Sequence, residues 1–517
     1  MGHSAEVVAD FADHTTAHGF GNVLRCDSCS GKGVWIVAML IAWTVCCIQL
    51  AVTIIAYLQY PTATTIAVQY SSNVQFPAVT VCNLNAARWS KMLNDSTLAN
   101  YTNTLKAARP QTRSWNEYAA GMGRSSLFNQ DNINEETAYK LLYIQAIYER
   151  NLPMSMMGHQ LEDMLLDCTF QGRQCAPQNF TQWQHGSYGN CYTIIIAKDQ
   201  YPSFIGPDYG LALTLFAEEY EYCPLISPAV GFRVAVHSPS YVPFPEDLGF
   251  TVSPGSMASV TMRQVIIARQ PFPYDGQDCR SILQDGNTGN PNIFTSWSNK
   301  MLKEGHQAGT NYTNQACKKS CYLLHLAKQC GCVDAAYVTY DQMKFAYGQS
   351  QTPRACNYSN STDVHCVRMA TITINADCDK VCDQPCYEED YDTRITNSLW
   401  PRPKYFSTMQ NAWSQRNPRL KNMTMQEASS QILKLEIYFR VLNYEAITES
   451  PAISLVDLLT NIGGTLGLYG GFSFLTILEF FECCARLTSR RKQRSKQENV
   501  VEQMTASHNQ RRHYTAK

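Results

Sequence analysis

Three carboxylates lie in or beside an apolar segment near the C-terminus. They are Asp457, Glu479 and Glu482, within the stretch from Ile453 to Cys484. An ionisable side chain at membrane depth is costly, so it normally faces a bundle interior or a water-filled path. Because rings of acidic side chains attract cations, symmetric copies of this segment would line a cation pathway at Glu479. Glu482 is nearer the basic flank, and the alternative for it is a place in the headgroup layer.

Glycines leave one face of the same segment almost without side chains. Gly463, Gly467 and Gly471 recur at intervals of four, with Gly464 and Gly470 beside them. Small residues in this register let helix backbones approach closely in a membrane. The alternative is a dimerisation stripe in a single-pass receptor. The segment's 32 residues would reach about 48 Å as one helix, against a hydrocarbon core of about 30 Å. It must therefore tilt, project beyond the membrane or break, and the glycines favour a break.

Only two segments are apolar enough to span a bilayer, Val34–Leu58 and Ile453–Cys484. Basic residues crowd the end of the second, which predicts a cytoplasmic C-terminus. Two spans place the N-terminus inside as well and Gln59–Ser450 outside, and no cleavable signal is expected before the first span. The expected organisation is a cytoplasmic segment at 1–33, a membrane helix at 34–58, an extracellular domain at 59–451, a pore-lining helix at 452–484 and a basic cytoplasmic tail at 485–517.

Glycosylation sequons support this orientation, because glycan acceptors belong in a lumenal loop. All seven N-x-S/T sequons fall between the two spans. They are Asn94, Asn100, Asn179, Asn311, Asn357, Asn360 and Asn422.

The cysteines indicate the same compartment. Fifteen of the 21 lie between the spans, and four of these form Cys317-x3-Cys321-x8-Cys330-x-Cys332. In an oxidising compartment such a cluster predicts a disulfide framework. A zinc site is the alternative, but neither the spacing nor the compartment fits it. We therefore expect no bound metal and no cofactor.

Composition excludes several function classes. The net charge is −1 and 16% of residues are charged, so nothing indicates nucleic-acid binding. No phosphate loop, nucleophile elbow or HExxH motif occurs, and we do not expect an enzyme. The region between the spans is large enough for a substantial core. Phe76–Leu84, Ala212–Phe216 and Gly231–His237 are typical of strands, and Glu136–Leu152 and Cys317–Gln329 of helices. The fold class is therefore an α+β membrane protein with a large mixed α/β extracellular domain.

Five segments together resemble the degenerin/epithelial sodium channel superfamily over nearly the whole chain. They are His18-Gly19, Phe76–Asn85, the cysteine-rich run Cys317–Cys386, Val441–Glu445, and Gly471-Phe472-Ser473. The resemblance implies a homotrimer in the plasma membrane whose second spans surround a sodium-selective pore blocked by amiloride. It assigns Gly471, Phe472 and Ser473 to the selectivity filter, Glu479 and Glu482 to the lower pore, and His18, Gly19 and Thr460 to gating.

The resemblance also implies seven disulfides and leaves Cys223 with no assigned partner. The implied pairs are Cys82–Cys191, Cys168–Cys175, Cys279–Cys386, Cys317–Cys382, Cys321–Cys378, Cys330–Cys366 and Cys332–Cys356.

Departures from subfamily patterns bear on what opens the pore. Acid-sensing members carry histidines where this chain has Tyr60–Thr64, and a lysine where it has Phe204–Tyr209. By contrast, Leu161–Cys168, Ser398–Pro401 and Gly467–Tyr469 are similar to invertebrate channels opened by FMRFamide-type peptides. We therefore expect an extracellular RF-amide neuropeptide as the activating ligand.

The peptide's binding site is not assigned by the sequence. A cationic amidated peptide calls for carboxylates and aromatic surface. Glu218–Tyr222 and Tyr387–Asp392 offer both, but each fits a solvated face or a calcium-attracting patch better. Alternatives to peptide gating are a proton-gated, mechanically gated or constitutive channel of the same superfamily. An alternative of another class is a two-span binding or adhesion receptor.

Overall fold

The chain forms two units, which we call the helical unit and the sheet unit. The helical unit comprises Met1–Ala63, Phe272–Gly276 and Ser450–Lys517, and the sheet unit Thr64–Pro271 and Gln277–Glu449. The computed structural model describes residues 10–71, 74–98, 135–196, 200–223, 226–274, 279–280, 293–294, 297–298, 311–348, 350–358, 360–489 and 492. The sequon at Asn100 and the tail beyond residue 492 lie outside the described residues.

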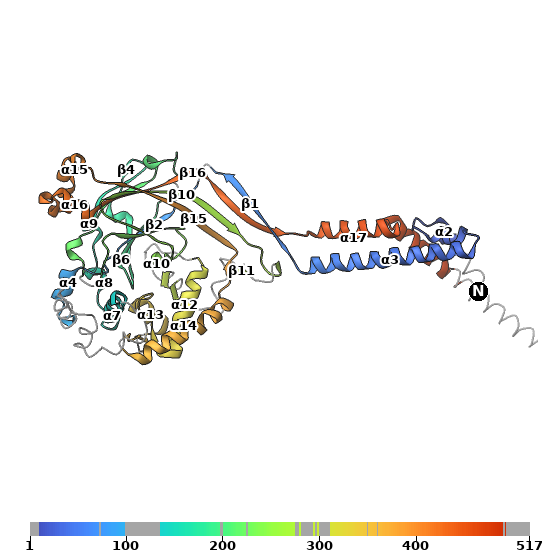
Figure 1. The fold of residues 1–517 in the computed structure, drawn as a ribbon, viewed down its shortest axis with the longest axis horizontal. Helices are drawn as coiled ribbons and strands as arrows, with labels where there is room; N and C mark the ends of the chain where they lie inside the picture. The colour runs from blue at the N-terminus through green and yellow to red at the C-terminus, as the bar shows by residue number, and fades with distance from the viewer. Residues whose placement is uncertain are drawn as a thin grey trace, which may run out of the picture. The chain divides into compact units, whose positions relative to one another are not determined.

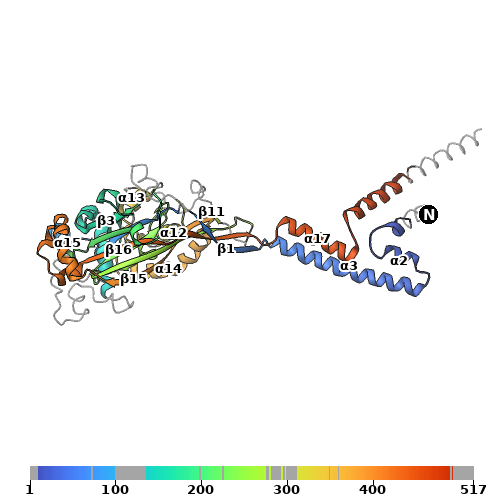
Figure 2. The same cartoon turned by 90° about the horizontal axis from the view of Figure 1, so that it is seen from above.

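The helical unit is built from α2 (Phe20–Arg25), α3 (Cys29–Leu58), α17 (Leu455–Gly470) and a further helix at Phe474–Ser489. α3 and α17 lie side by side (Figures 1 and 2). In the described part of the chain, α3 alone is long and apolar enough to cross a membrane. α17 and Phe474–Ser489 pass the same test together as a pair bent by 67°. The segment Ile453–Cys484 thus breaks, as its length and glycines predict.

Local capping decides where these helices begin. α3 starts five residues before the expected span because Ser28 Oγ accepts a hydrogen bond from Gly31 N. α17 starts with a reciprocal capping box, in which Ser454 Oγ accepts from Asp457 N and Asp457 Oδ2 accepts from Ser454 N at 3.0 Å. Asp457, one of the three carboxylates of the apolar segment, is therefore a helix cap.

The sheet unit contains two large sheets (Figure 1). The seven-stranded sheet has the order β15-β10-β16-β7-β3-β4, with β1 beside β16. β10 pairs with β15 antiparallel and with β16 parallel. Its strands are β1 (Thr62–Tyr70), β3 (Leu165–Phe170), β4 (Arg173–Gln174), β7 (Leu211–Phe216), β10 (Ser256–Ala268), β15 (Tyr387–Leu399) and β16 (Ile432–Pro451).

The five-stranded sheet has the order β5-β6-β2-β8-β9. Its strands are β2 (Ala78–Asn83), β5 (Phe180–His185), β6 (Gly189–Ile194), β8 (Phe232–His237) and β9 (Phe250–Val252). Two strand pairs are short: β11 (Cys279–Arg280) with β14 (Gln384–Pro385), and β12 (Cys332–Val333) with β13 (Arg354–Ala355). Side chains of both large sheets, such as Val81 and Leu435, share one hydrophobic cluster, so the main core lies between the sheets.

Helices surround the sheets. They are α4 (Trp89–Asn94), α7 (Glu135–Glu149), α8 (Met154–Met157), α9 (Leu161–Met164), α10 (Pro245–Leu248), α12 (Asn314–Cys330), α13 (Tyr340–Tyr347), α14 (Ser361–Val381), α15 (Pro403–Arg416) and α16 (Met425–Gln431). The three strands and two helices predicted from sequence patterns are confirmed as β2, β7, β8, α7 and α12. All five were expected from the local pattern of apolar and polar residues.

Seven disulfides connect the sheet unit, and they are the seven pairs that the resemblance implies. Two of them, Cys317–Cys382 and Cys321–Cys378, join α12 to α14. Cys223 is in none of the seven. It is buried in a second hydrophobic cluster, and burial raises the pKa of its thiol to about 12.

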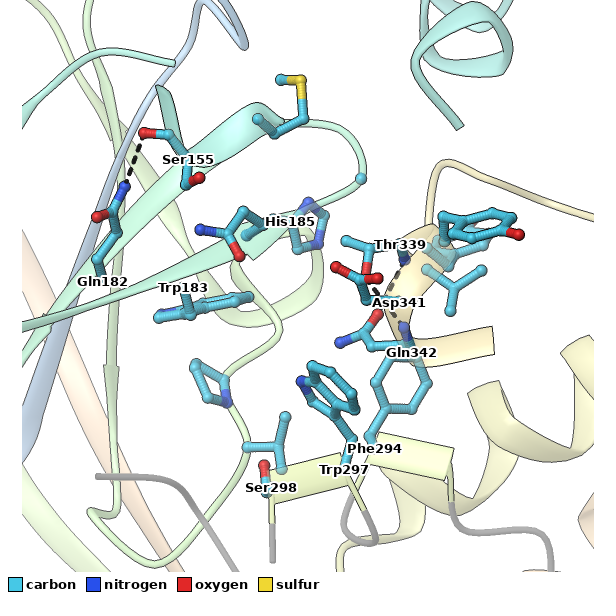
Figure 3. A pocket seen from close by; sticks show the side chains of 18 of the residues that line it. Ser155, Gln182, Trp183, His185, Phe294, Trp297, Ser298, Thr339, Asp341 and Gln342 are labelled. Carbon is cyan, nitrogen blue, oxygen red and sulfur yellow. Dashed lines mark hydrogen bonds between the residues drawn. The ribbon is translucent and has the colours of Figure 1, made fainter. Parts of the chain in front are cut away.

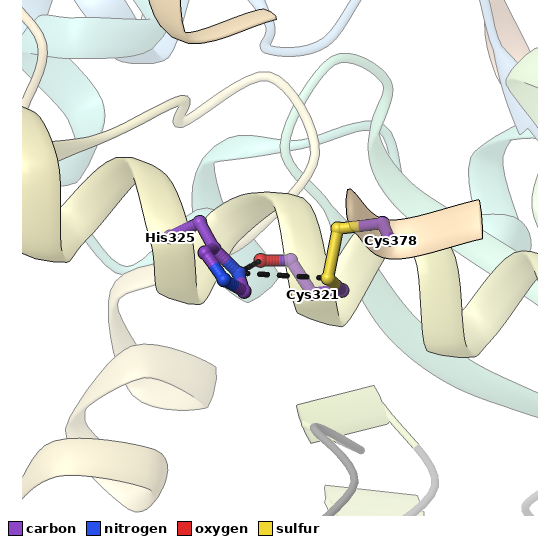
Figure 4. A group of neighbouring side chains, drawn as sticks. All are labelled: Cys321, His325 and Cys378. Atoms are coloured by element: carbon purple, nitrogen blue, oxygen red, sulfur yellow. Dashed lines mark hydrogen bonds between the residues drawn. A yellow bond between two sulfur atoms is a disulfide. The ribbon is translucent and has the colours of Figure 1, made fainter. Parts of the chain in front are cut away.

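One group of side chains has the composition of a metal site. His325 Nδ1 lies 3.5 Å from Cys321 Sγ, and Cys378 is adjacent. Figure 4 shows that the two sulfur atoms are bonded to each other. Cysteine binds a metal ion as a free thiolate, and both sulfur atoms here are in a disulfide, so this group is a disulfide beside a histidine.

The predicted glycosylation sites differ in exposure. Asn94, Asn179, Asn360 and Asn422 are exposed, whereas Asn311 and Asn357 are half-buried. Glycosylation itself stays a prediction at all seven sequons.

The two segments that combine carboxylates with aromatic residues are engaged within the fold. Glu218 is 3% exposed and bonds to His159 Nδ1 at 2.8 Å, whereas Glu219 in the same segment is exposed. Burial raises the pKa of Glu218, but hydrogen bonds from His159 and Tyr220 outweigh burial and hold it below its ordinary value. In Tyr387–Asp392, Glu388 pairs with Arg269 at 2.8 Å and Asp392 with Arg440 at 2.7 Å.

His237 makes the stability of the sheet unit depend on pH. Burial lowers its pKa from 6.5 to about 4, although a hydrogen bond to Ser238 O acts in the other direction. Between these values the unfolded chain binds a proton that the folded chain does not. The stabilisation is therefore present above pH 6.5, declines toward pH 4, and the loss amounts to about 2 kcal/mol at pH 5.

Acidification to pH 5 should lower the thermal midpoint of the solubilised chain in both the wild type and His237→Gln. We expect the decrease to be several degrees smaller in His237→Gln, because this variant lacks the buried histidine. The matched control is His365→Gln, which changes an exposed histidine of α14. If the thermal midpoints of the His237 and His365 variants fall equally at pH 5, His237 is not the source of this pH dependence.

Candidate ion pathway

The break between α17 and the following helix consists of the three residues expected to form the filter. Gly471 ends α17 with φ 67° and ψ 16°, the left-handed conformation that glycine adopts without strain. Its N–H donates to Gly467 O at 3.0 Å. Ser473 begins the next helix, because its Oγ accepts from Thr476 N at 3.3 Å while its own N–H donates to Thr476 Oγ1 at 3.0 Å. Gly471, Phe472 and Ser473 therefore interrupt the helix.

The His18-Gly19 pair packs directly against this break. His18 N donates to Gly470 O at 2.9 Å, which satisfies one of the carbonyls that the end of α17 leaves without a helical partner. A Cβ added at Gly471 would lie 2.6 Å from the His18 ring. Gly19 has φ +90°, and a Cβ there would lie 2.7 Å from Met39 Cγ. Both glycines are required by close approach as well as by backbone conformation.

Glu479 is held by the same N-terminal segment. Its Oε2 accepts hydrogen bonds from Thr15 Oγ1 at 2.9 Å and from Thr16 N at 3.0 Å. Thr16 Oγ1 is 2.5 Å from Thr476 Oγ1, and Thr476 is fully buried. The carboxylate that the sequence identifies as the main acidic group therefore also anchors residues 15–16 to the helix after the break.

Aromatic rings connect Phe472 to the rest of the helical unit. The Phe472 ring lies 5.5 Å from Trp43 of α3 in an edge-to-face arrangement and 6.0 Å from Phe480. Phe480 in turn lies 4.8 Å from Phe11. Such ring pairs stabilise by roughly 0.5–1.5 kcal/mol beyond burial, so the position of Phe472 depends on both α3 and the N-terminal segment.

Glu482 lies beside this junction, and Thr460 lies away from it on α17. Glu482 Oε1 pairs with Arg486 at 2.6 Å, and Arg486 also reaches Asp10 at 3.3 Å. Both pairs are exposed and contribute little to stability. They border a cavity of about 330 Å³ that Glu479 also lines. Thr460 is exposed on α17, eleven residues before Gly471, and its hydroxyl donates to Val456 O at 2.8 Å.

Sequence reasoning missed four residues of the junction. Thr15, Thr16, Trp43 and Thr476 hold Glu479 and Phe472 in place. Thr15 and Glu479 are 464 positions apart, and no spacing rule connects them. The resemblance located His18-Gly19 beside the pore, but it did not name the atoms that make the contact.

The other ends of α3 and α17 are also tied together. Ala452 N donates to Pro61 O at 2.8 Å, and β1, which follows α3, pairs with β16, which precedes α17. Tyr60, two residues after α3, meets the Tyr274 ring at 5.6 Å, edge to face. The hydrogen bond between Ala452 and Pro61 therefore joins the segment after α3 to the segment before α17.

The contact between His18 and Gly471 can be tested by cross-linking. Cysteines at Thr16 and Thr476, in a background with the other cysteines of the helical unit replaced by serine, should form a disulfide on oxidation. Adding Gly471→Ala should reduce the cross-linked fraction several-fold, because the methyl group collides with His18. The control is Gly463→Ala, whose methyl group meets nothing within 4 Å. Equal cross-linking of the two alanine variants would contradict the contact.

Comparison with known proteins identifies relatives of the whole chain. Residues 11–483 match the protein family described as "Amiloride-sensitive sodium channel". The chain is 24% identical to epithelial sodium channel subunit beta-2 of Xenopus laevis, over 92% of this chain and 82% of that protein. It is 27% identical to acid-sensing ion channel 1C of Danio rerio, over 95% and 87%. It is 25% identical to the FMRFamide-activated amiloride-sensitive sodium channel of Cornu aspersum, over 93% and 83%.

The family match spans nearly all of the helical and sheet units, including both sides of the broken helix. The length of this match and the seven disulfides together assign the chain to a family. The chain belongs to the amiloride-sensitive sodium channel family.

Proposed function

We propose that this chain is the subunit of a homotrimeric, sodium-selective and amiloride-blocked channel of the plasma membrane that an extracellular RF-amide peptide opens. The observation that carries the proposal is the interruption of the apolar helix at Gly471-Phe472-Ser473. Irregular backbone at membrane depth is tolerated only where it is buried in protein or lines a water-filled cavity. Its polar groups are then available to a permeating cation.

Two membrane spans follow from this proposal. α3 is the first, and α17 with Phe474–Ser489 is the second, broken span. Arg486 and the other basic residues after the second span then place both termini in the cytoplasm. The sheet unit lies outside the cell, which agrees with its seven disulfides.

Several copies of the chain are needed, because one broken helix cannot enclose a pore. The face of α17 that carries Gly463 and Gly464 is open: a Cβ at either position meets nothing within 4 Å. This face lets neighbouring copies approach closely. In a symmetric trimer the three Glu479 carboxylates form a ring that attracts sodium ions. Sodium is the permeant ion here, and no cofactor is involved.

Peptide gating is supported by the relative from Cornu aspersum, which is FMRFamide-activated. The acid-sensing relative from Danio rerio supports the main alternative, gating by protons. Tyr60–Thr64 contains no histidine, and the buried His237 stays neutral until the pH approaches about 4. We therefore favour the peptide.

The proposal is tested by expressing the chain alone and recording current at negative voltage while applying FMRFamide, acid and amiloride in turn. We expect an inward sodium current that appears only with the peptide and that amiloride blocks. Current evoked by acid alone, or present without any stimulus, would favour another channel of the family. Absence of all current from chains shown to reach the cell surface would favour the binding-receptor alternative.

The charge and the anchoring role of Glu479 can be separated by substitution. Glu479→Gln keeps an oxygen that can accept from Thr15 and Thr16 but removes the charge. We expect it to lower single-channel sodium conductance several-fold, with the half-maximal peptide concentration unchanged. Glu427→Gln, the same change on an exposed carboxylate of α16, is the control and should leave conductance unaltered. An unaltered conductance in Glu479→Gln would remove Glu479 from the ion path.

A further inference from the structure

We propose that the cationic, amidated end of the activating peptide binds in an aromatic cavity of the sheet unit, with Asp341 as its charge partner. This inference rests on the proposed peptide gating. The cavity has a volume of about 410 Å³. Its size falls within the roughly 300–1,000 Å³ of small-molecule sites. Figure 3 shows it between β5, α13 and the residues around Phe294 and Trp297.

Aromatic side chains from separate parts of the chain form the walls. Tyr148 of α7 packs against Tyr340 of α13 with ring centroids 5.6 Å apart. Phe244, after β8, packs against Phe294 at 5.2 Å. Trp183 of β5 and Trp297 also line the cavity. These rings provide a hydrophobic surface for an aromatic or aliphatic group of a ligand.

Most polar groups in the walls already have partners. Trp183 Nε1 donates to Thr193 Oγ1 at 3.0 Å, and Tyr148 OH donates to Pro353 O at 3.0 Å. His185 bonds through Nε2 to Glu246 at 2.9 Å and through Nδ1 to Ser187 N at 3.1 Å. These bonds fix the wall side chains in place, so the cavity is preorganised for a ligand.

Asp341 is the one negatively charged residue among the described lining residues. It lies exposed in the first turn of α13, and within the described residues its carboxylate makes no hydrogen bond or ion pair. No other carboxylate and no lysine or arginine occurs among the described lining residues. A cationic group bound here would therefore form a charge-assisted hydrogen bond with Asp341, the strongest polar contact that the lining offers.

Two of the aromatic rings, Phe244 and Tyr337, already have a cation–π contact with a lysine of the protein. Lys319 Nζ lies 4.7 Å from the Phe244 ring and 4.8 Å from the Tyr337 ring. Glu246 and Asp247 neutralise this lysine, with Nζ 2.9 Å from Asp247 Oδ2. The lysine therefore adds no net attraction for an anion, and the ligand's cation is directed to Asp341.

The described lining contains no lysine or arginine, which explains why the peptide's C-terminus would be an amide. A free C-terminal carboxylate would enter a cavity that has Asp341 but no described lysine or arginine to pair with it. Desolvating an unpaired charge is unfavourable. An amide is neutral and can both donate and accept hydrogen bonds. The ligand that fits is thus a short peptide with an arginine next to an amidated aromatic residue.

The cavity wall also contacts the strands that lead toward α17. Tyr241 OH accepts from Glu389 N at 3.1 Å, and Ser238 Oγ donates to Glu389 Oε2 at 2.9 Å. Glu389 belongs to β15, which pairs with β10, and β10 pairs with β16. A ligand bound here therefore contacts a segment that is hydrogen-bonded to the sheet containing β16.

The test is a double-mutant cycle between peptide and channel. The probes are FMRFamide, its free acid, and an analogue with neutral citrulline in place of arginine. On the wild type, citrulline should raise the half-maximal concentration about tenfold, the size expected for losing one charge-assisted contact. On Asp341→Asn, the half-maximal concentration of FMRFamide should rise about tenfold. Replacing arginine by citrulline should then raise the half-maximal concentration hardly further, because the charge partner is gone. The half-maximal concentrations of the amide and the free acid should also differ less than on the wild type. Asp377→Asn, on an exposed aspartate of α14, is the control.

A second measurement tests the cavity with Asp341 left unchanged. Ser155 lines the cavity and is exposed, so Ser155→Cys should react with a bulky methanethiosulfonate reagent. Labelling should abolish the peptide response, and prior peptide should protect the thiol. An undiminished response after complete labelling, or an Asp341→Asn channel that keeps the full citrulline penalty, would overturn the site.

Failure of the site can be distinguished from failure of the channel. Thr460→Phe places a bulky side chain at the position that the family resemblance links to opening. We expect this variant to give amiloride-blocked current without peptide. The double variant Ser155→Cys/Thr460→Phe should give the same current after labelling. If these controls conduct and the cycle shows no coupling, the site is wrong and the channel stands. If Thr460→Phe and peptide-treated wild type both fail to conduct, the proposed function fails as well.

Discussion

The helical unit depends on one constraint, the need to satisfy backbone groups where a membrane-competent helix is interrupted. At Gly471 the helix stops in a left-handed turn, and the last carbonyls of α17 lose their helical partners. His18 N supplies one hydrogen bond, to Gly470 O. The short approach of the His18 ring then requires glycine at position 471. The break, the N-terminal segment and the glycine are thus one structural arrangement.

Glu479 gives this arrangement a second attachment. Its carboxylate fixes Thr15 and Thr16, so the residue expected to attract cations also positions the segment that packs against the three-residue interruption. Phe472 is held from the other side by Trp43 of α3. Changes at either end of the chain therefore act on the same three-residue interruption, although those ends are more than 400 positions apart.

The sheet unit obtains its rigidity by different means. Disulfides hold α12 and α14 together, and the two large sheets share a core of side chains such as Val81 and Leu435. A rigid framework is what a preorganised ligand site requires, because little conformational freedom is then lost on binding. The cavity beside Asp341 lies where α7, β5, α13 and the 238–244 segment meet, and no single element could form it.

The sequence by itself determined the features that depend on local pattern. Apolar length predicted α3 and the second apolar segment, local residue patterns predicted β2, β7, β8, α7 and α12, and glycine content predicted the break. The family resemblance supplied the disulfide pairs, the filter residues and the role of His18-Gly19.

Tertiary structure alone decided which distant groups meet. Glu218 belongs to a segment expected to be a solvated face or a calcium-attracting patch, yet Glu218 itself is buried against His159, which lies 59 positions away in the sequence. Asp457 proved to be a helix cap. The threonines that hold Glu479, and the cavity around Asp341, left no local signal in the sequence. Contacts of this kind arise from how elements pack, and neither periodicity nor spacing along the chain encodes that directly.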